Sequence, residues 1–224
     1  MMKMSSSGYR AAWVRMSAIA SVLTALSVGG GLAGANPSGE AAAVSSAFSA
    51  ASWTGTPLDG IDPAVFALAL DAAAHAVASD QVRNPGTLTV IDYSKPSTEK
   101  RMWVFDLRTR ALIFKELVSH GRGSGKTRAT TFSNVPESNM TSLGLFRTAE
   151  PYVGQNGYSL RLDGLERGVN DRARDRAIVV HGAPYVNAAT AKANGYLGRS
   201  LGCPAVRPEI ARQLIDTILS LIHI

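Results

Sequence analysis

Cysteine is almost absent from this chain, since Cys203 is the only one among 224 residues. A single thiol excludes a disulfide within the chain and leaves two readings, a small buried apolar residue or a reactive nucleophile. Histidine is also scarce, with four residues. His75, His120, His181 and Cys203 lack a close ligand spacing such as His-x3-His, so the sequence predicts no metal site and no cofactor.

Charge of one sign is not in large excess. The formal net charge is +6, and charged residues make up 18% of the chain. Removing a leader that carries Lys3, Arg10 and Arg15 reduces this charge to about +3, too little to favour a nucleic-acid partner. The hydrophobic fraction of 46% is that of a globular protein and excludes disordered and collagen-like classes.

Long apolar runs are missing as well. Residues 1–35 have a basic front, a short apolar middle over 16–28 and the small-residue site Ala33-Gly34-Ala35, which together predict a secretory signal peptide. The apolar run weakens into glycines at 29–31, so no stable membrane span is expected after signal removal. The predicted location is therefore outside the cytoplasm, in the periplasm or cell envelope, where an unpaired cysteine suggests a working thiol.

The rest of the chain divides at Asn84-Pro85-Gly86. Residues 36–84 read as a helical preface, with helices over 40–53 and 62–79, the second capped by Asp62. From 85 to 219 the pattern changes to alternation and predicts an α+β domain that is mainly β with flanking helices. Its first three strands, 87–93, 101–107 and 111–119, are expected to form an antiparallel meander. Later elements are strands at 142–148, 158–162 and 177–180, and a C-terminal helix at 208–219.

Residues 120–127, His-Gly-Arg-Gly-Ser-Gly-Lys-Thr, invite comparison with a phosphate-binding loop. That motif needs glycine five residues before the Gly125-Lys126 pair, where this chain has His120. We therefore expect no nucleotide, and we interpret the glycines as a flexible loop. Residues 94–130 carry nine Lys or Arg against three Asp or Glu. That bias suits substrates with free carboxylates, and a solvated face explains it equally well.

A histidine and the cysteine stand at two chain positions suited to joint chemistry. The β-branched run 177–180 delivers His181 at a strand end, and 22 residues later Gly202-Cys203-Pro204 presents the thiol on a constrained turn. A thiol becomes a strong nucleophile when a nearby imidazole takes its proton. The residues thus predict acyl transfer, with a buried inert cysteine as the alternative.

The order of strand, His-Gly, a loop of about twenty residues and Ser-x-Gly-Cys resembles the L,D-transpeptidase (YkuD-like) catalytic domain. The stretch 200–206, Ser-Leu-Gly-Cys-Pro-Ala-Val, is similar to its murein L,D-transpeptidase branch. The likeness extends over 87–219 and implies that family's β-sandwich or mixed sheet. Leu201 departs from the pattern, because the better-known branch has histidine there.

The resemblance implies roles for the site residues. Cys203 would be the nucleophile and His181 the base, oriented by the Gly182 main-chain carbonyl, where glycine lets the backbone turn. The tight turn itself offers an oxyanion hole from the amides of Leu201, Gly202 and Cys203. Residues at the edge of this site are expected to bind or enclose the substrate: Arg199 and Ser200 through a substrate carboxylate, Tyr158 and Tyr185 as cleft walls, and Asn170 and Arg176 as supports.

The same resemblance implies peptidoglycan stem peptides as partners, joined through a Cys203 thioester. Two other activities stay open: an L,D-carboxypeptidase or hydrolase on this scaffold, and a catalytically inactive cell-wall-binding domain. The sequence gives no signal for the oligomeric state.

The last six residues, 219–224, are expected to be a non-native tail. Leu-Ser-Leu-Ile-His-Ile can be encoded by a transposon-end adapter used in preparing sequencing libraries. On this interpretation the native C-terminus is missing, and His223 has no function.

Overall fold

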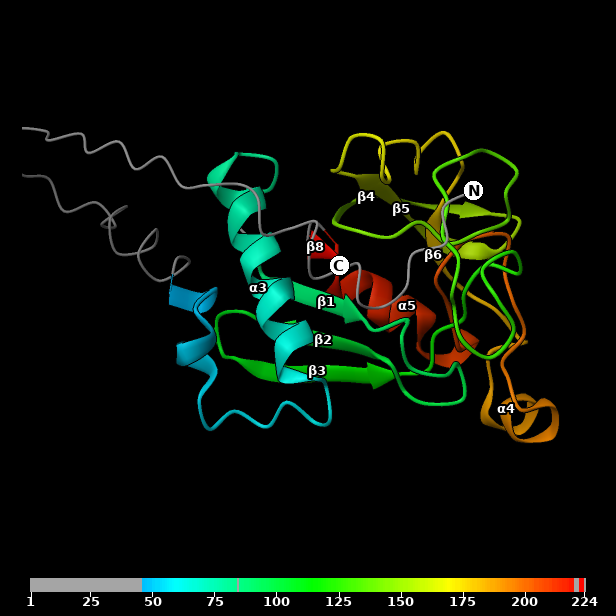
Figure 1. Ribbon diagram of the computed structural model, residues 1–224, viewed down its shortest axis with the longest axis horizontal. Coiled ribbons are helices and arrows are strands. Elements are labelled where there is room, and N and C mark those ends of the chain that lie inside the picture. The colour runs from blue at the N-terminus through cyan, green and yellow to red at the C-terminus, as the bar shows by residue number, and fades with distance from the viewer. Residues whose placement is uncertain (1–45, 84, 220–221, 224) are drawn as a thin grey trace, which may run out of the picture.

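The computed structural model describes residues 46–83, 85–219 and 222–223. The predicted signal peptide and the start of the helix predicted over 40–53 lie outside these ranges. The described strands form one eight-stranded sheet in the order β3-β2-β1-β8-β4-β5-β6-β7 (Figure 1). The sheet is mixed, since the β1–β8 and β6–β7 pairs are parallel. The expected α+β class with a mixed sheet is confirmed.

The elements follow the predicted order with three additions, one of which, strand β8, lies where a non-native tail was expected. The predicted meander is present, with both of its strand pairs antiparallel. A short helix α4 and the two-residue strand β7 were not predicted. The bounds are η1 Ala50–Trp53, α3 Pro63–Ala78, β1 Thr87–Ile91, β2 Met102–Asp106, β3 Ala111–Glu116, β4 Phe146–Gly154, β5 Gly157–Gly164, β6 Val179–Gly182, α4 Ala188–Asn194, β7 Ala205–Val206, α5 Pro208–Thr217 and β8 Ile222–His223.

Helix α3 begins where the sequence predicts. The Asp62 carboxylate accepts the Ala64 N–H at 2.7 Å, and Pro63 occupies the first turn. The buried side of α3 packs on β1 and β2, and η1 joins the same core. That core contains, among others, Trp53, Phe66, Leu70, Leu88, Val90, Trp103 and Phe105. The helical preface and the sheet therefore share one apolar core across residue 84.

Helix α5 packs against the opposite side of the sheet (Figure 1). Its apolar side chains recur at helical spacing and meet side chains that alternate along the strands. This second core contains Met102, Val104, Leu160, Leu162, Val180, Val206, Leu214, Ile215 and Ile218. Met102 and Val104 of β2 face α5, whereas Trp103 and Phe105 face α3, so the sheet is covered on both sides.

Strand β4 differs from its prediction, because it begins at Phe146 and continues past Pro151 to Gly154. Proline lacks an N–H for the ladder, which makes a long strand through Pro151 unexpected. The pairing of β4 with β5 shifts register between Thr148 and Pro151. A bulge at this shift accommodates the proline.

Strand β8 falls within the suspected tail. Ile222 pairs with Leu88 of β1 and with Arg147 of β4, and so lies inside the sheet rather than at its edge. None of the helices in the described ranges is long and apolar enough to cross a membrane.

Replacing Leu70 with alanine should destabilise the fold by about 2–5 kcal/mol, because this fully buried side chain fills the core between α3 and the sheet. Leu68, on the same helix but 42% exposed, is the matched control, and its alanine variant should lose less than about 1 kcal/mol. Urea unfolding followed by circular dichroism measures both. Equal losses at the two positions would contradict a core shared by preface and sheet.

Candidate active site

The turn that carries Cys203 is closed by Ser200. The Ser200 hydroxyl donates to the Cys203 carbonyl at 2.7 Å and accepts the Gly202 N–H at 3.1 Å. Gly202 has φ +134°, and a Cβ there would lie 2.9 Å from the Met140 carbonyl oxygen, so the turn requires glycine. The thiol of Cys203 is left partly exposed.

His181 lies in β6 with 4% of its surface exposed. Its Nδ1 contacts the Gly182 carbonyl oxygen at 3.0 Å. A carbonyl oxygen can only accept, so the proton belongs on Nδ1 and Nε2 is the basic nitrogen. Burial lowers the pKa of His181, and the bond to Gly182 offsets part of this effect. The imidazole is therefore neutral near pH 7 and able to take a proton.

Gly182 serves a different purpose from the backbone turn expected from the sequence. Its φ is not in the left-handed region. A Cβ at this position would instead lie 3.0 Å from Ala211 Cβ and 3.1 Å from Pro208 Cα. Glycine is needed here because α5 approaches the strand closely.

The structure brings Cys203 and His181 to neighbouring strands without joining them. His181 pairs with Ala205 in the parallel β6–β7 ladder, and Cys203 lies two residues before Ala205, an offset of about 6–7 Å. Cys203 belongs to the turn just before β7, which brings it beside β6 without placing it in the β6–β7 ladder. The thiol donates to the Ala177 carbonyl at 3.6 Å rather than to the imidazole. Catalytic hydrogen bonds are often long without substrate and tighten when it binds.

Opposing effects act on the Cys203 thiol. Burial raises its pKa, whereas the Val179 N–H and the Arg176 guanidinium lower it. The net direction is upward, so thiol and imidazole both rest in their neutral forms. Attack on a carbonyl therefore requires His181 to take the sulfur proton.

Two of the three amides predicted for the oxyanion hole are open. The Gly202 N–H is already bonded to Ser200 Oγ. Within the described ranges, the Leu201 and Cys203 N–H groups donate to no other residue. The Leu201 side chain is 62% exposed. A developing oxyanion would therefore find its donors at Leu201 and Cys203.

Of the four predicted substrate-binding residues, Arg199, Ser200 and Tyr185 lie near the cysteine turn. Ser200 is buried and bonded within the turn, and Arg199 donates to the Gly125 carbonyl at 3.1 Å. Tyr185 packs on the same side of the sheet as Ala205, and burial followed by the nearby Cys203 charge raises its pKa.

Tyr158 faces away from the candidate site. Ser159 pairs with His181, so strand alternation places Tyr158 on the α5 side of the sheet. There its hydroxyl donates to Asp216 at 2.7 Å. The sequence identified the strand but not its register, and a shift of one residue reverses the face.

The glycine-rich loop packs against the cysteine turn, so its interpretation as a flexible loop was wrong. Gly121 forms a bridge with Ser200, and a Cβ on Gly121 would lie 2.9 Å from Gly202 Cα. These glycines permit close approach of two backbones.

His120, which opens this loop, is fully buried. Its Nδ1 lies 2.7 Å from Arg101 Nη2 and must accept, because arginine only donates. Burial, then the Arg101 charge, lowers the pKa of His120 to about 4. It is a neutral structural histidine.

Tyr93 is a neighbour of the site that the sequence analysis missed. It is buried just after β1, with Arg101 over its ring at 5.1 Å. Burial is the main cause that raises its pKa, and the Cys203 charge adds to the shift. Its only sequence signal was a polar aromatic residue at a strand end.

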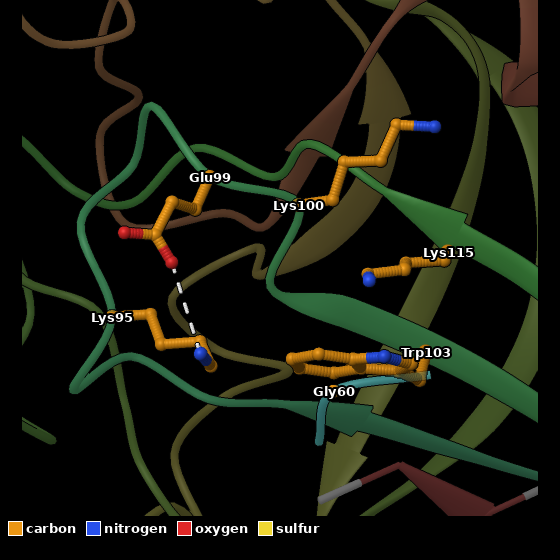
Figure 2. Close-up of a pocket in the computed structure, with 6 residues that line it drawn as sticks. All are labelled: Gly60, Lys95, Glu99, Lys100, Trp103 and Lys115. Atoms are coloured by element: carbon orange, nitrogen blue, oxygen red, sulfur yellow. Dashed lines mark ion pairs between the residues drawn. The ribbon is translucent and has the colours of Figure 1, made fainter. Parts of the chain in front are cut away.

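A hollow of about 410 Å³ is lined by residues outside the cysteine turn (Figure 2). It is lined by Gly60, Lys95, Glu99, Lys100, Trp103 and Lys115. Lys95 pairs with Glu99 at 3.7 Å, and Lys115 pairs with Asp59 at 3.2 Å. The basic bias of residues 94–130 is thus partly neutralised by ion pairs. No group of three or more metal-ligating side chains occurs in the described part of the chain.

A family model described as the L,D-transpeptidase catalytic domain matches residues 58–222. The chain belongs to this family. The resemblance of the His-Gly and Ser-x-Gly-Cys motifs to L,D-transpeptidases is confirmed. No curated protein matches the chain.

Several solved L,D-transpeptidase structures are similar to the chain. One is the L,D-transpeptidase LdtMt1 in complex with imipenem, at 15% identity and a TM-score of 0.37. The match covers 62% of this chain and 57% of that one. An L,D-transpeptidase from Mycobacterium smegmatis is 16% identical with a TM-score of 0.38, and the match covers 62% of this chain and 58% of that one. Residues 123–326 of the L,D-transpeptidase from Xylanimonas cellulosilytica are 16% identical with a TM-score of 0.34, and the match covers 67% of this chain and 68% of that one. The chain thus spans less than two thirds of the first two.

Proposed function

We propose that this L,D-transpeptidase domain cross-links peptidoglycan stem peptides through a thioester on Cys203. The observation that supports it most directly is that the turn before β7, which carries the half-buried Cys203, lies beside β6, which carries a neutral imidazole whose Nε2 is basic. Belonging to the family supplies the substrate class.

The proposed reaction has two halves. His181 Nε2 takes the proton of Cys203 as sulfur bonds to the amide carbonyl carbon of a donor stem tetrapeptide. The amide C–N bond then breaks, and the leaving D-alanine amine takes that proton from the imidazolium. An acceptor amine next attacks the thioester and passes a proton to His181. The C–S bond breaks, and the sulfur regains a proton from the imidazolium.

The turn around Cys203 has the parts that this chemistry requires. The Leu201 and Cys203 amides are unclaimed donors for the tetrahedral oxyanion. The Gly182 carbonyl holds the imidazole so that Nε2 is basic. Tyr185 lies on the same side of the sheet as Ala205 and forms a wall of the proposed cleft. Arg199, beside the turn, is the proposed partner for a substrate carboxylate.

The site of action is proposed to be the cell envelope. Residues 1–35 have the pattern of a secretory signal, and peptidoglycan lies outside the cytoplasm. We propose that a carbapenem acylates Cys203, because its strained lactam carbonyl is open to attack by an activated thiol.

Incubating the protein with a tetrapeptide donor and a separate acceptor amine should release D-alanine and form a joined peptide in equal amounts. Mass spectrometry of the products measures both. A freed tripeptide without the joined product would assign the domain to hydrolysis. No release of D-alanine would contradict both activities and favour the binding-domain alternative.

A further inference from the structure

Arg176 is a half-buried cation without a counter-anion in the described part of the chain. Its guanidinium donates four hydrogen bonds to neutral oxygens of the segment 133–142, and none to a carboxylate. The acceptors are the Ser133 carbonyl at 2.5 Å, the Met140 carbonyl at 2.6 Å, the Ser138 hydroxyl at 3.2 Å and the Ser142 hydroxyl. Its Nε is buried and has no partner. A desolvated charge without an opposite charge is costly, which makes this guanidinium a candidate for a functional role.

The guanidinium lies beside the cysteine turn. A Cβ built on Gly202 would be 3.4 Å from Arg176 Nη2. The electrostatic effect is reciprocal, because Arg176 lowers the pKa of Cys203 and a Cys203 thiolate raises that of Arg176. Burial has the larger effect on each pKa and acts in the opposite direction, lowering that of Arg176 and raising that of Cys203. The anion that faces the Arg176 guanidinium is therefore the Cys203 thiolate, which exists only when Cys203 has lost its proton.

We propose that Arg176 is a positioning residue that supplies the counter-charge for the Cys203 thiolate and fixes the segment 133–142 behind the turn. This inference rests on the proposed function, because a thiolate is needed only if Cys203 reacts. The role goes beyond the pair of His181 and Cys203, which moves the proton but adds no lasting positive charge beside the sulfur.

Two of the three residues after Arg176, Ala177 and Val179, also contact the Cys203 sulfur. The Ala177 carbonyl accepts the thiol hydrogen at rest, and the Val179 N–H is a donor that lowers the pKa of the thiol. Ala177 adopts φ +52°, a left-handed conformation that is uncommon for a residue with a side chain. This turn directs the carbonyl at the thiol immediately after the guanidinium. The segment 176–179 therefore contacts Cys203 in both its protonated and its ionised form.

The other groups that face Cys203 carry no positive charge near neutral pH. Tyr93, after β1, and Tyr185, after β6, are phenols whose pKa values are raised mainly by burial. His181 is neutral because burial lowers its pKa. Arg176 is thus the cation assigned to the thiolate.

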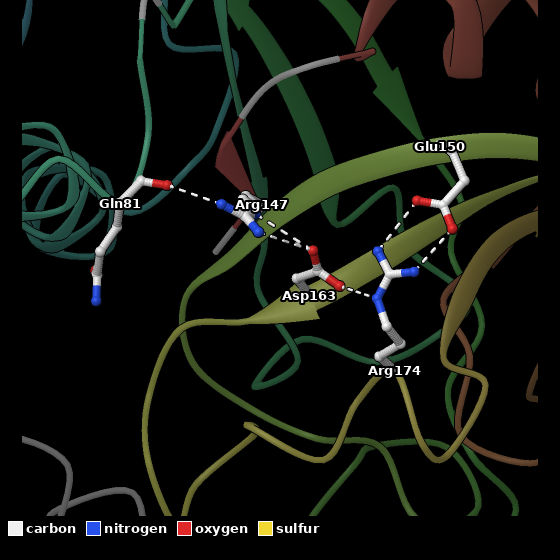
Figure 3. Close-up of polar contacts among 5 residues, drawn as sticks. All are labelled: Gln81, Arg147, Glu150, Asp163 and Arg174. Atoms are coloured by element: carbon white, nitrogen blue, oxygen red, sulfur yellow. Dashed lines mark hydrogen bonds and ion pairs between the residues drawn. The ribbon is translucent and has the colours of Figure 1, made fainter.

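The turn that carries Arg176 is held to the sheet by its neighbour Arg174. Arg174 donates to Glu150 at 2.7 Å and to Asp163 at 2.6 Å, and Asp163 also accepts from Arg147 (Figure 3). These exposed pairs each contribute little stability alone. As a connected network across β4 and β5 they fix the orientation of the turn.

The test measures thiol reactivity apart from transpeptidation. The rate of Cys203 alkylation by iodoacetamide is followed from pH 5 to pH 10 in the wild type, Arg176→Gln, Arg176→Lys and Arg172→Gln. Arg172 lies on the same turn, is exposed and does not act on Cys203, so it controls for net charge. We expect Arg176→Gln to alkylate about tenfold more slowly at pH 7, with its profile displaced to higher pH. Arg176→Lys should recover most of the rate, and Arg172→Gln should match the wild type.

An unchanged profile in folded Arg176→Gln would overturn the proposal. So would an Arg176→Lys profile displaced as far as that of the glutamine variant, because shape rather than charge would then matter. If the glutamine variant does not fold, Arg176→Met replaces it. Loss of folding in both neutral variants but not in the lysine variant would make the role structural and count against the proposal. A displaced profile in a protein that forms no cross-links would refute the proposed function alone.

Discussion

Replacing Cys203 with alanine is expected to abolish all covalent turnover and all labelling by imipenem. Cys203 is the only sulfur nucleophile in the chain, and no second cysteine can substitute for it. Intact-protein mass spectrometry after incubation with imipenem should show one adduct on the wild type and none on the variant. A serine at this position should also remain unlabelled, because a hydroxyl is a far weaker nucleophile than a thiol without a strong base.

The alanine variant should keep its fold, which makes the result interpretable. The hydrogen bond that the resting Cys203 thiol donates, to the Ala177 carbonyl at 3.6 Å, is weak. The turn itself is held by Ser200 and Gly202 through bonds that do not involve sulfur. Urea unfolding should therefore be within about 1 kcal/mol of the wild type. An imipenem adduct that persisted on Cys203→Ala would show that another residue is the nucleophile.

Replacing His181 with alanine should lower the rate of D-alanine release by roughly a hundredfold to ten-thousandfold, the usual effect of removing a general base. The thiol rests in its neutral form because burial raises its pKa, so attack without a base is slow. His75 is the matched control: it is exposed on α3, and its alanine variant should keep the wild-type rate. A His181 variant with most of its activity would remove this residue from the mechanism.

The pH dependence of kcat/KM tests the role of His181 independently. Burial places the pKa of His181 below its ordinary value of 6.5, so the imidazole loses its proton at lower pH than a free one. The base form is then available into mild acid, and the acid limb of kcat/KM should have its midpoint below pH 6.5. This limb should vanish in the residual activity of His181→Ala. A wild-type midpoint above pH 6.5 would contradict a buried, neutral base.

Regular alternation and helix caps allowed much of this fold to be predicted. The meander β1–β3 lies within the predicted strand ranges, and α3 starts at a capping aspartate followed by proline. Strand β7 has only two residues, Ala205 and Val206, and its pairing with β6 arises from tertiary contacts that no local pattern records. Strand β4 contains Pro151 and depends on a bulge, which local propensity argues against.

The candidate site was predictable in its chemistry more than in its surroundings. The sequence pointed to Cys203 and His181 because a lone thiol and a strand-end imidazole are distinctive residue types, and the family resemblance implied the Gly182 carbonyl as the partner of the imidazole. It placed Tyr158 on the wrong side, because the face of a strand depends on a register that the sequence does not specify. It missed the thiol's bond to the Ala177 carbonyl, because that contact depends on a left-handed turn at an ordinary alanine.

The core that α3 shares with β1 and β2 limits where the domain can be truncated. A fragment that begins at residue 85, where the strands start, would lose the helix that covers Leu88, Val90, Trp103 and Phe105. Such a fragment would present an aromatic surface to water and would be prone to self-association during expression. Because Phe48 and Trp53 also belong to this core, a soluble recombinant form should retain the chain from before Ala47.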